Sequence, residues 1–268
     1  MRIFFLSIII AGNFFFSGCT DENAVDSRFR LKEYVSGYAQ SGLYKTFSSN
    51  SSTIHCCVIE YKNGKVSKVI HKNSVWLPMS AVEGFSENTF IDSYHEYFYE
   101  GNSVEIIWKI NSSEISYTPD TVQLTLDDQG RIIKRINCNT KDTTTYFYSE
   151  SGLLSKSVSY NGTRSSITRT FFFDSNNNLV SINGEIEGGD GNKTHVNEYF
   201  EEFDTGINGF KESGVIEGAF IRSLSQNNFN VYTSAIYHNN ILIDSMMVRL
   251  PVTYSDKDYP VYGNCLTK

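Results

Sequence analysis

The sequence lacks any run of basic residues, and its formal net charge is −7. Because phosphate binding requires clustered lysine and arginine, this pattern argues against nucleic acid as a partner. GxSxG, HExxH and P-loop motifs are also missing, which removes common signatures of serine hydrolases, zinc proteases and nucleotide-binding enzymes. No CxxC pair is present. We therefore expect no metal site and no cofactor, and we identify no catalytic residue from these motifs.

Long apolar runs are missing after the first residues of the chain. The one such run covers residues 3–16, with Arg2 before it and Ser17, Gly18 and Cys19 after it. Its 14 residues fall short of the roughly 20 that a membrane-spanning helix needs. The length of the run and its small-residue end predict a cleaved signal peptide over residues 1–18.

The residues around Cys19 resemble the lipobox of bacterial lipoproteins, although Phe16 stands where that family usually has an aliphatic residue. The resemblance implies that Cys19 becomes the lipidated first residue of the mature chain, with the membrane as a partner through this anchor. The following stretch, "TDENAVDSR", resembles the acidic stretch of surface-exported Bacteroidetes lipoproteins. This implies an outer-membrane, surface-exposed location. An ordinary secretory signal with an unmodified Cys19 is the alternative.

Four cysteines follow Cys19, namely Cys56, Cys57, Cys138 and Cys265. An exported protein lies in a compartment that permits disulfides. Adjacent residues of a strand point to opposite faces, so Cys56 and Cys57 are poorly placed to pair with each other. Cys138 and Cys265 are candidate partners, and the sequence leaves the connectivity open.

Proline is scarce, with 4 residues, whereas aromatic residues make up 14% of the chain. Aromatic and β-branched residues fit the half-buried surface of a β-sheet. Six stretches share one pattern, in which an aromatic or aliphatic strand end leads into a polar turn and then an apolar alternating strand. The residues just before the six turns are Tyr61, Tyr99, Leu126, Tyr148, Phe173 and Tyr254. A repeat of roughly 20–25 residues with this pattern is one β-hairpin and its return.

Alternation within the repeats predicts which residues face the core. In residues 154–160 it places Leu154, Val158 and Tyr160 on one face and the serines, including Ser157, on the solvated face. The apolar residues that follow the turns are also expected to face the core, and examples are Val66, Ile132, Leu154 and Val180.

The stretches "LDDQGRIIKRI" and "FYSESGLLSKSV" resemble the YD-type hairpin repeats of Bacteroidetes lipoproteins that carry domains of unknown function. A late segment, "EEFDTGINGFKESG", also resembles that family, with Gly209 in place of the usual proline. The resemblance covers roughly residues 59–263 and implies an exported antiparallel meander, without implying an activity. We predict an all-β fold of repeated hairpins that form a large twisted or curled sheet, with one short helix or long loop near residues 209–226.

The predicted domain organisation has three parts. Residues 1–18 are the lipoprotein signal peptide, residues 19–45 are a tether and N-terminal segment, and residues 46–268 are the β-hairpin repeat domain.

One stretch, "FDSNNNLVSI", has two interpretations. Asp174, Asn176 and Asn178 alternate as the first ligands of a calcium loop do. However, Leu179 stands where such a loop needs glycine for its sharp turn. The related turns elsewhere in the chain favour a hairpin, in which these residues form the turn.

Two classes of function remain open. The leading hypothesis is a lipid-anchored envelope protein of structural or ligand-binding type, whose partner is a glycan, another envelope protein or a host molecule. Most of the aromatic rings are expected to form the core and the cross-strand ladders of the sheet. A few tyrosines, together with Trp76 and Trp108, are candidates for stacking such a partner. The scattered histidines, including His71 and His95, are expected to be structural. The alternative is an exported glycan hydrolase or accessory glycan-binding subunit, which as an enzyme needs two carboxyl groups about 5–9 Å apart. The candidates are Glu185, Glu187, Glu201, Glu202, Asp127 and Asp128.

Overall fold

The computed structural model describes residues 31–35, 56–77, 89–111, 117–161, 166–187, 193–255 and 260–262. The predicted signal peptide and the lipid-anchor residue Cys19 lie outside these ranges. Within them, no helix has both the length and the apolar character needed to cross a membrane.

One antiparallel sheet of 14 strands dominates the structure, and its strands follow one another in chain order. Each strand pairs with its sequence neighbours, so the predicted meander is confirmed. The strands are β1 (Glu33–Val35), β2 (Cys56–Lys62), β3 (Lys65–Leu77), β4 (Thr89–Glu100), β5 (Ser103–Ile110), β6 (Thr121–Leu126), β7 (Ile132–Asn137), β8 (Thr143–Tyr148), β9 (Leu154–Tyr160), β10 (Ser166–Phe173), β11 (Leu179–Glu187), β12 (Lys193–Phe203), β13 (Phe229–His238) and β14 (Ile241–Arg249).

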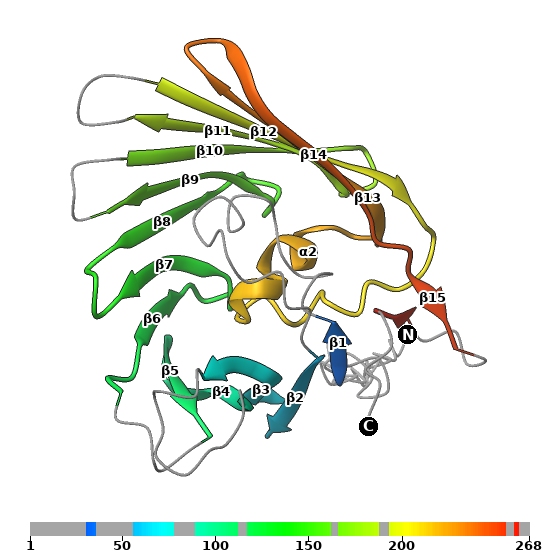
Figure 1. The fold of residues 1–268 in the computed structure, drawn as a ribbon. Helices are drawn as coiled ribbons and strands as arrows, with labels where there is room; N and C mark the ends of the chain where they lie inside the picture. The colour runs from blue at the N-terminus through cyan, green and yellow to red at the C-terminus, as the bar shows by residue number, and fades with distance from the viewer. Residues whose placement is uncertain are drawn as a thin grey trace, which may run out of the picture.

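The sheet has two edges, because β1 and β14 each pair with one strand among the described residues. Figure 1 shows the strands arranged along an arc, with a short helical segment on its inner side. This segment contains the 3₁₀ helix η4 (Glu217–Ala219) and the α-helix α2 (Phe220–Leu224). The short helix predicted near residues 209–226 is therefore confirmed.

Three hairpin turns share one geometry. They begin at Asp127, Ser149 and Asp174. The backbone amide of each of these residues donates to the carbonyl of the fourth residue after it, and its carbonyl accepts from the amide of the third. The third residue has positive φ in every case: 76° for Gly130, 82° for Gly152 and 62° for Asn177. Glycine and asparagine tolerate this left-handed conformation, which explains the turn composition seen in the sequence.

A β-bulge next to each of these turns shifts the phase of the strands. The register changes at Leu126, Tyr148 and Phe173, just before the turns. A bulge places two residues of one strand opposite one residue of its partner, which turns the following side chains to the other face. The residues just before these turns, Leu126, Tyr148 and Phe173, are partly buried and pack against the core clusters.

The bulges correct two predictions about facing. Leu179, which is fully buried, occupies the core position after its turn that was predicted for Val180. In β9, Leu154 faces the core as predicted, but the bulge then turns Ser157 inward, where it is 2% exposed. Tyr160 faces solvent. Strict alternation fails here because one extra residue lies between Leu154 and the paired part of the strand.

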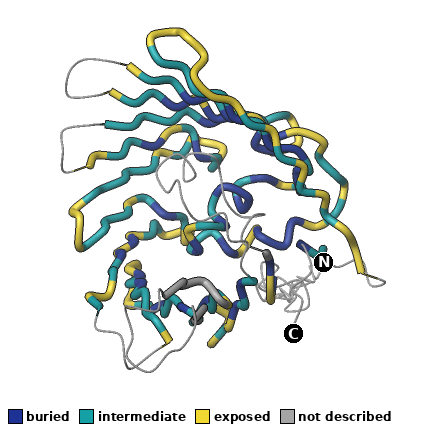
Figure 2. The backbone as a smooth tube through the Cα atoms, in the orientation of Figure 1, coloured by how far each residue is buried: buried dark blue, intermediate teal, exposed yellow. Residues whose placement is uncertain are grey.

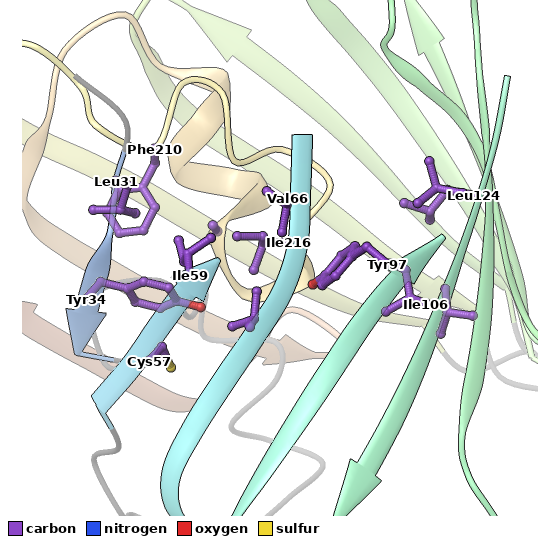
Figure 3. Close-up of a cluster of buried hydrophobic side chains, with 14 of the residues drawn as sticks. Leu31, Tyr34, Cys57, Ile59, Val66, Tyr97, Ile106, Leu124, Phe210 and Ile216 are labelled. Atoms are coloured by element: carbon purple, nitrogen blue, oxygen red, sulfur yellow. The ribbon is translucent and has the colours of Figure 1, made fainter. Parts of the chain in front are cut away.

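The core lies between the sheet and the segment 208–228. Figure 2 shows buried residues along α2 and along the parts of the strands that surround it. One cluster packs Phe210 and Ile216 of this segment on β1–β7, and Figure 3 shows their side chains among those of Leu31, Tyr34 and Tyr97. A second cluster packs Ile221 of α2 on β9–β13. The segment thus fills the concave side of the sheet and joins its two ends.

The sixth predicted hairpin forms a separate two-stranded sheet of β15 (Thr253–Tyr254) and β16 (Pro260–Val261). Tyr262, which follows β16, is buried, and its ring lies 4.3 Å from that of Phe210 between centroids. The Tyr262 hydroxyl accepts a hydrogen bond from the Gly209 amide at 2.8 Å and donates one to the Asn228 side chain. The last described residues therefore stabilise the segment that fills the core.

Candidate ligand site

An interior cavity of about 190 Å³ lies between the inner face of β1–β10 and residues 214–221. The strands provide one wall and η4 and α2 provide the other. Glu217 lies at the rim, since its side chain lines the cavity and is 44% exposed. For comparison, an engineered protein cavity of about 150 Å³ binds benzene. The cavity is therefore large enough for a small molecule.

Three polar side chains on the neighbouring strands β8, β9 and β10 form one row along the wall of the cavity. Tyr146 of β8 lies opposite Ser157 of β9, and Ser157 lies opposite Arg169 of β10. Directly opposite residues on antiparallel strands have Cβ atoms about 5 Å apart, so these side chains are neighbours. All three line the cavity. The row presents two hydroxyl groups and one guanidinium group to the cavity, next to apolar side chains such as Ile132 and Phe171.

Arg135 and Glu217 form an ion pair at the rim of this row. The Arg135 Nη2 atom donates to Glu217 Oε1 at 2.8 Å. Burial raises the pKa of Tyr146, while the positive charges of Arg135 and Arg169 act in the opposite direction. Tyr146 therefore remains a neutral hydroxyl donor at physiological pH. Its ring packs edge-on against Phe220 of α2, with centroids 5.3 Å apart.

Arg169 has no ion pair with a carboxylate among the described residues. Its Nε atom is buried and makes no hydrogen bond within that part of the chain. A buried donor without a partner costs free energy, because its hydration is lost without compensation. Arg169 is therefore a charged residue on the cavity wall with one buried donor that has no partner.

A hydrogen-bonded chain of Cys57, His71 and His95 lies at the other end of the cavity. Cys57 Sγ is 3.3 Å from His71 Nδ1, and His71 Nε2 is 2.9 Å from His95 Nδ1. Burial raises the pKa of Cys57 to about 12, although a hydrogen bond with Tyr34 acts in the opposite direction. Burial lowers the pKa of His95, while the charges of Glu217 and Asp120 act in the opposite direction.

Burial therefore favours the thiol form of Cys57 and the neutral form of His95. A reactive cysteine needs a lowered pKa, because the thiolate is the nucleophile. The arrangement therefore does not match an activated Cys–His pair. Among the described residues, no group of three histidine, cysteine, aspartate or glutamate side chains is arranged to hold a metal ion.

Asp120 also lines the cavity, immediately before β6. Its Oδ2 atom accepts a hydrogen bond from the Asn137 side chain at 3.3 Å, and its backbone oxygen accepts one from Trp108 at 2.9 Å. The Oδ1 atom is buried without a partner in the described part of the structure. Asp120 and Arg169 are separated by the four strand spacings from β6 to β10, or about 19 Å along the sheet.

The carboxylates proposed for hydrolysis lie away from this cavity. Glu185 and Glu202 are bonded to Lys193 and Arg249, and Asp127 holds its own hairpin turn. Glu185 belongs to a shallower groove on the outer face of β10–β13. None of the six predicted carboxylates, all of which the structure describes, lines the interior cavity.

The predicted aromatic and histidine residues have mixed outcomes. Trp108 lines the cavity and packs edge-on against Tyr117, with ring centroids 5.5 Å apart. Trp76 is in β3, and its side chain lies outside the described part of the chain. His71 and His95, expected to be scattered, meet because β3 and β4 pair antiparallel.

The cysteines divide into two kinds. Cys56 is disulfide-bonded, whereas Cys57 and Cys138 are free thiols. Cys138 is therefore not the partner of Cys56, and the partner lies outside the described residues. Cys56 and Cys57 are not paired with each other, in agreement with their opposite facing in β2.

The two cavity arginines that sequence reasoning missed, Arg135 and Arg169, share one signal. In "SITRTFFF", Arg169 has the same phase as the buried Phe171. A charged residue at an inward position of a strand is unusual, because buried charges need partners. The inward position of Arg135 can be recognised in the sequence only when the bulge at Leu126 is taken into account.

No family model matches this sequence, and no curated protein matches it at a significant level. The solved structures similar to it include a porin-like protein from Bacteroides vulgatus, with a TM-score of 0.42 and 11% identity over 85% of this chain and 88% of that chain. Another is a porin-like protein from Bacteroides uniformis, with a TM-score of 0.45 and 10% identity over 77% of this chain and 80% of that chain. Likenesses at this level establish neither a family nor a function for the chain.

Proposed function

We propose that the protein is a lipid-anchored envelope protein that binds a small molecule in the interior cavity. The observation that carries the proposal is the cavity itself, which combines apolar walls with a few convergent polar groups. Ligand sites in proteins have this composition, because apolar area gives affinity and polar groups fix orientation. The aromatic residues around the cavity otherwise serve the core.

The anchor and location rest on the N-terminal sequence. The signal-like residues 1–18, Cys19 and the acidic stretch after it support lipidation and export to the outer membrane, with exposure at the cell surface. Radiolabelled palmitate incorporated in a bacterial host should be lost in Cys19→Ala and retained in Cys138→Ala. Labelling that survives Cys19→Ala would contradict the anchor without affecting the cavity.

Ligand binding is tested by filling the cavity. Ser157→Phe places a ring where a buried hydroxyl lines the wall. We expect small aromatic fragments to raise the melting temperature of the mature wild-type chain and to leave that of Ser157→Phe unchanged. Ser155→Phe on the same strand is the control, because Ser155 lies outside the cavity lining and bonds the Phe147 carbonyl at the surface. Equal shifts in wild type and Ser157→Phe would contradict binding in the cavity.

Glycan hydrolysis has one observation in its favour, which is that Asp120 and Glu217 both line the cavity. Glu217 is engaged by Arg135, and neither residue is among the carboxylates predicted from the sequence. Binding without reaction therefore accounts better for the site. Release of reducing sugar that Asp120→Asn and Glu217→Gln each abolish would reverse this order.

A further inference from the structure

We propose that the ligand of the interior cavity is a small organic carboxylate, whose anionic group binds at Arg169 beside Tyr146 and Ser157 and whose apolar body fills the cavity. This inference rests on the proposed function, because it names the chemical class of molecule that the same cavity takes. The inference depends on an observation that the proposed function does not use, which is that the Arg169 guanidinium group has no ion-pair partner among the described residues.

The charge balance of the row favours one negative charge. Arg135 is neutralised by Glu217 at 2.8 Å, so Arg169 leaves one net positive charge near Tyr146. Guanidinium groups bind carboxylates through two parallel N–H···O bonds, which are shorter and stronger than bonds between neutral groups. Tyr146 and Ser157 add hydroxyl donors next to Arg169 in the cross-strand row.

The opposite end of the cavity does not compete for this anion. Burial favours the uncharged forms of Cys57 and His95, and both side chains lie within hydrogen-bond distance of His71. Asp120 is negative and would repel an anion, which directs the charged group of the ligand toward β10. A cationic ligand would face two arginines, of which one has no ion pair to offset it.

The remaining wall determines the rest of the ligand. Ile106, Leu124, Ile132, Phe171 and Ile221 surround the space between the sheet and α2. These five side chains offer no hydrogen-bonding groups, so the part of the ligand that lies against them is apolar. The volume of about 190 Å³ suits a single aromatic ring or a short aliphatic chain. Benzoate and its neutral counterpart benzyl alcohol are therefore suitable probes.

The test measures dissociation constants of both probes for the mature chain by titration calorimetry. Arg169→Gln should weaken benzoate binding about tenfold or more, because a charge-assisted pair is lost. It should change benzyl alcohol binding by less than about twofold, since that ligand carries no charge. Glu217→Gln should tighten benzoate binding several-fold, because it removes a negative charge and releases Arg135.

Lys156→Gln is the matched control, because Lys156 is an exposed cation on β9 that faces away from the cavity. It should leave benzoate binding unchanged. If Arg169→Gln does not fold, Arg169→Lys keeps the charge without the planar fork and should still weaken benzoate binding several-fold.

The outcomes separate the two proposals. Equal affinity for both probes, or benzoate binding insensitive to Arg169→Gln, would overturn the carboxylate inference and leave the ligand cavity in place. An equal loss in Lys156→Gln would also overturn it, because the effect would then be general electrostatics. Binding of neither probe would overturn the proposed function together with the inference.

Discussion

At the scale of single residues, Asp174 shows how a motif with two interpretations is resolved by its hydrogen bonds. Its carboxylate accepts bonds from the backbone of Asn176 at 2.9 Å and of Asn178 at 2.8 Å. Asp127 accepts equivalent bonds in the turn of the β6–β7 hairpin. An aspartate that organises its own turn in two copies of a repeat has a structural role, as the hairpin interpretation predicted.

Replacing Asp174 by alanine should destabilise the fold by about 1–2 kcal/mol, because two turn amides lose their acceptor. Ser175→Ala, at the exposed neighbouring position, should change stability by less than about 0.5 kcal/mol. Urea denaturation of the three proteins measures the difference. A rise in melting temperature with calcium that Asp174→Ala abolishes would restore the calcium interpretation.

His95 gives the fold a defined pH dependence. Its folded-state pKa is lowered mainly by burial, so the unfolded chain binds the proton more readily. The stabilisation is complete above the unfolded pKa of about 6.5 and is lost as the pH falls below that value. We expect the free energy of unfolding to decrease between pH 7.5 and pH 5, and His95→Gln to show a smaller decrease. Parallel pH profiles for the two proteins would contradict this assignment.

The cavity residues show which part of the site could be predicted from the sequence. The inward position of Arg169 could have been predicted from the sequence, because Arg169 lies two residues before the buried Phe171 in the same strand. The inward position of Ser157 could not be predicted from the sequence, because it depends on a bulge that strict alternation does not reveal. Glu217 and Arg135 are 82 residues apart in the chain, and only the folded segment 208–228 brings them together. Pairings of this kind depend on tertiary structure, which no local pattern encodes.

At the scale of elements, the hairpins were the most predictable feature. Five of the six predicted turns connect consecutive strands of the large sheet, and their composition follows from positive φ at Gly64, Gly101, Gly130, Gly152 and Asn177. The sixth, at Tyr254, pairs separately from that sheet. Its neighbours Pro251 and Pro260 explain part of this difference, since proline cannot donate a ladder hydrogen bond.

The segment 208–228 covers the concave side of the sheet and is held in place by its own hydrogen bonds. Arg222, which is 2% exposed, lies 3.9 Å over the Phe229 ring and donates to the Phe229 carbonyl at 3.1 Å. Asn208 donates to the carbonyls of Arg222 and Ser225. These bonds hold a short helix that could not form alone, because isolated helices need about 12–15 residues.

Truncating Ile221 of α2 to alanine should cost about 2–5 kcal/mol, because its side chain is 7% exposed and packs in the second core cluster. Ile207→Ala, at a position 44% exposed immediately before this segment, should cost less than about 1 kcal/mol. Guanidinium denaturation measures both. Similar losses at the two positions would show that the segment does not hold the core as described.

At the scale of the whole molecule, the described strands form a sheet with two edges, and its concave side is filled by its own chain. Figure 1 shows α2 inside the arc, and the core clusters on either side of it share Phe220 and Tyr146 as contacts. A sheet of this size needs its inner face covered, because apolar area exposed to water is unfavourable. The filling is incomplete between β1–β10 and residues 214–221, and that gap is the proposed ligand site.

The most direct test of ligand binding in this cavity is a crystal structure of the mature chain soaked with 4-bromobenzoate. The bromine atom marks the position of the ligand through its anomalous signal. We predict a bromine peak between the inner face of the sheet and α2, with the carboxylate facing Arg169. An empty cavity under conditions that saturate the crystal, or bromine peaks on the outer surface alone, would contradict the account.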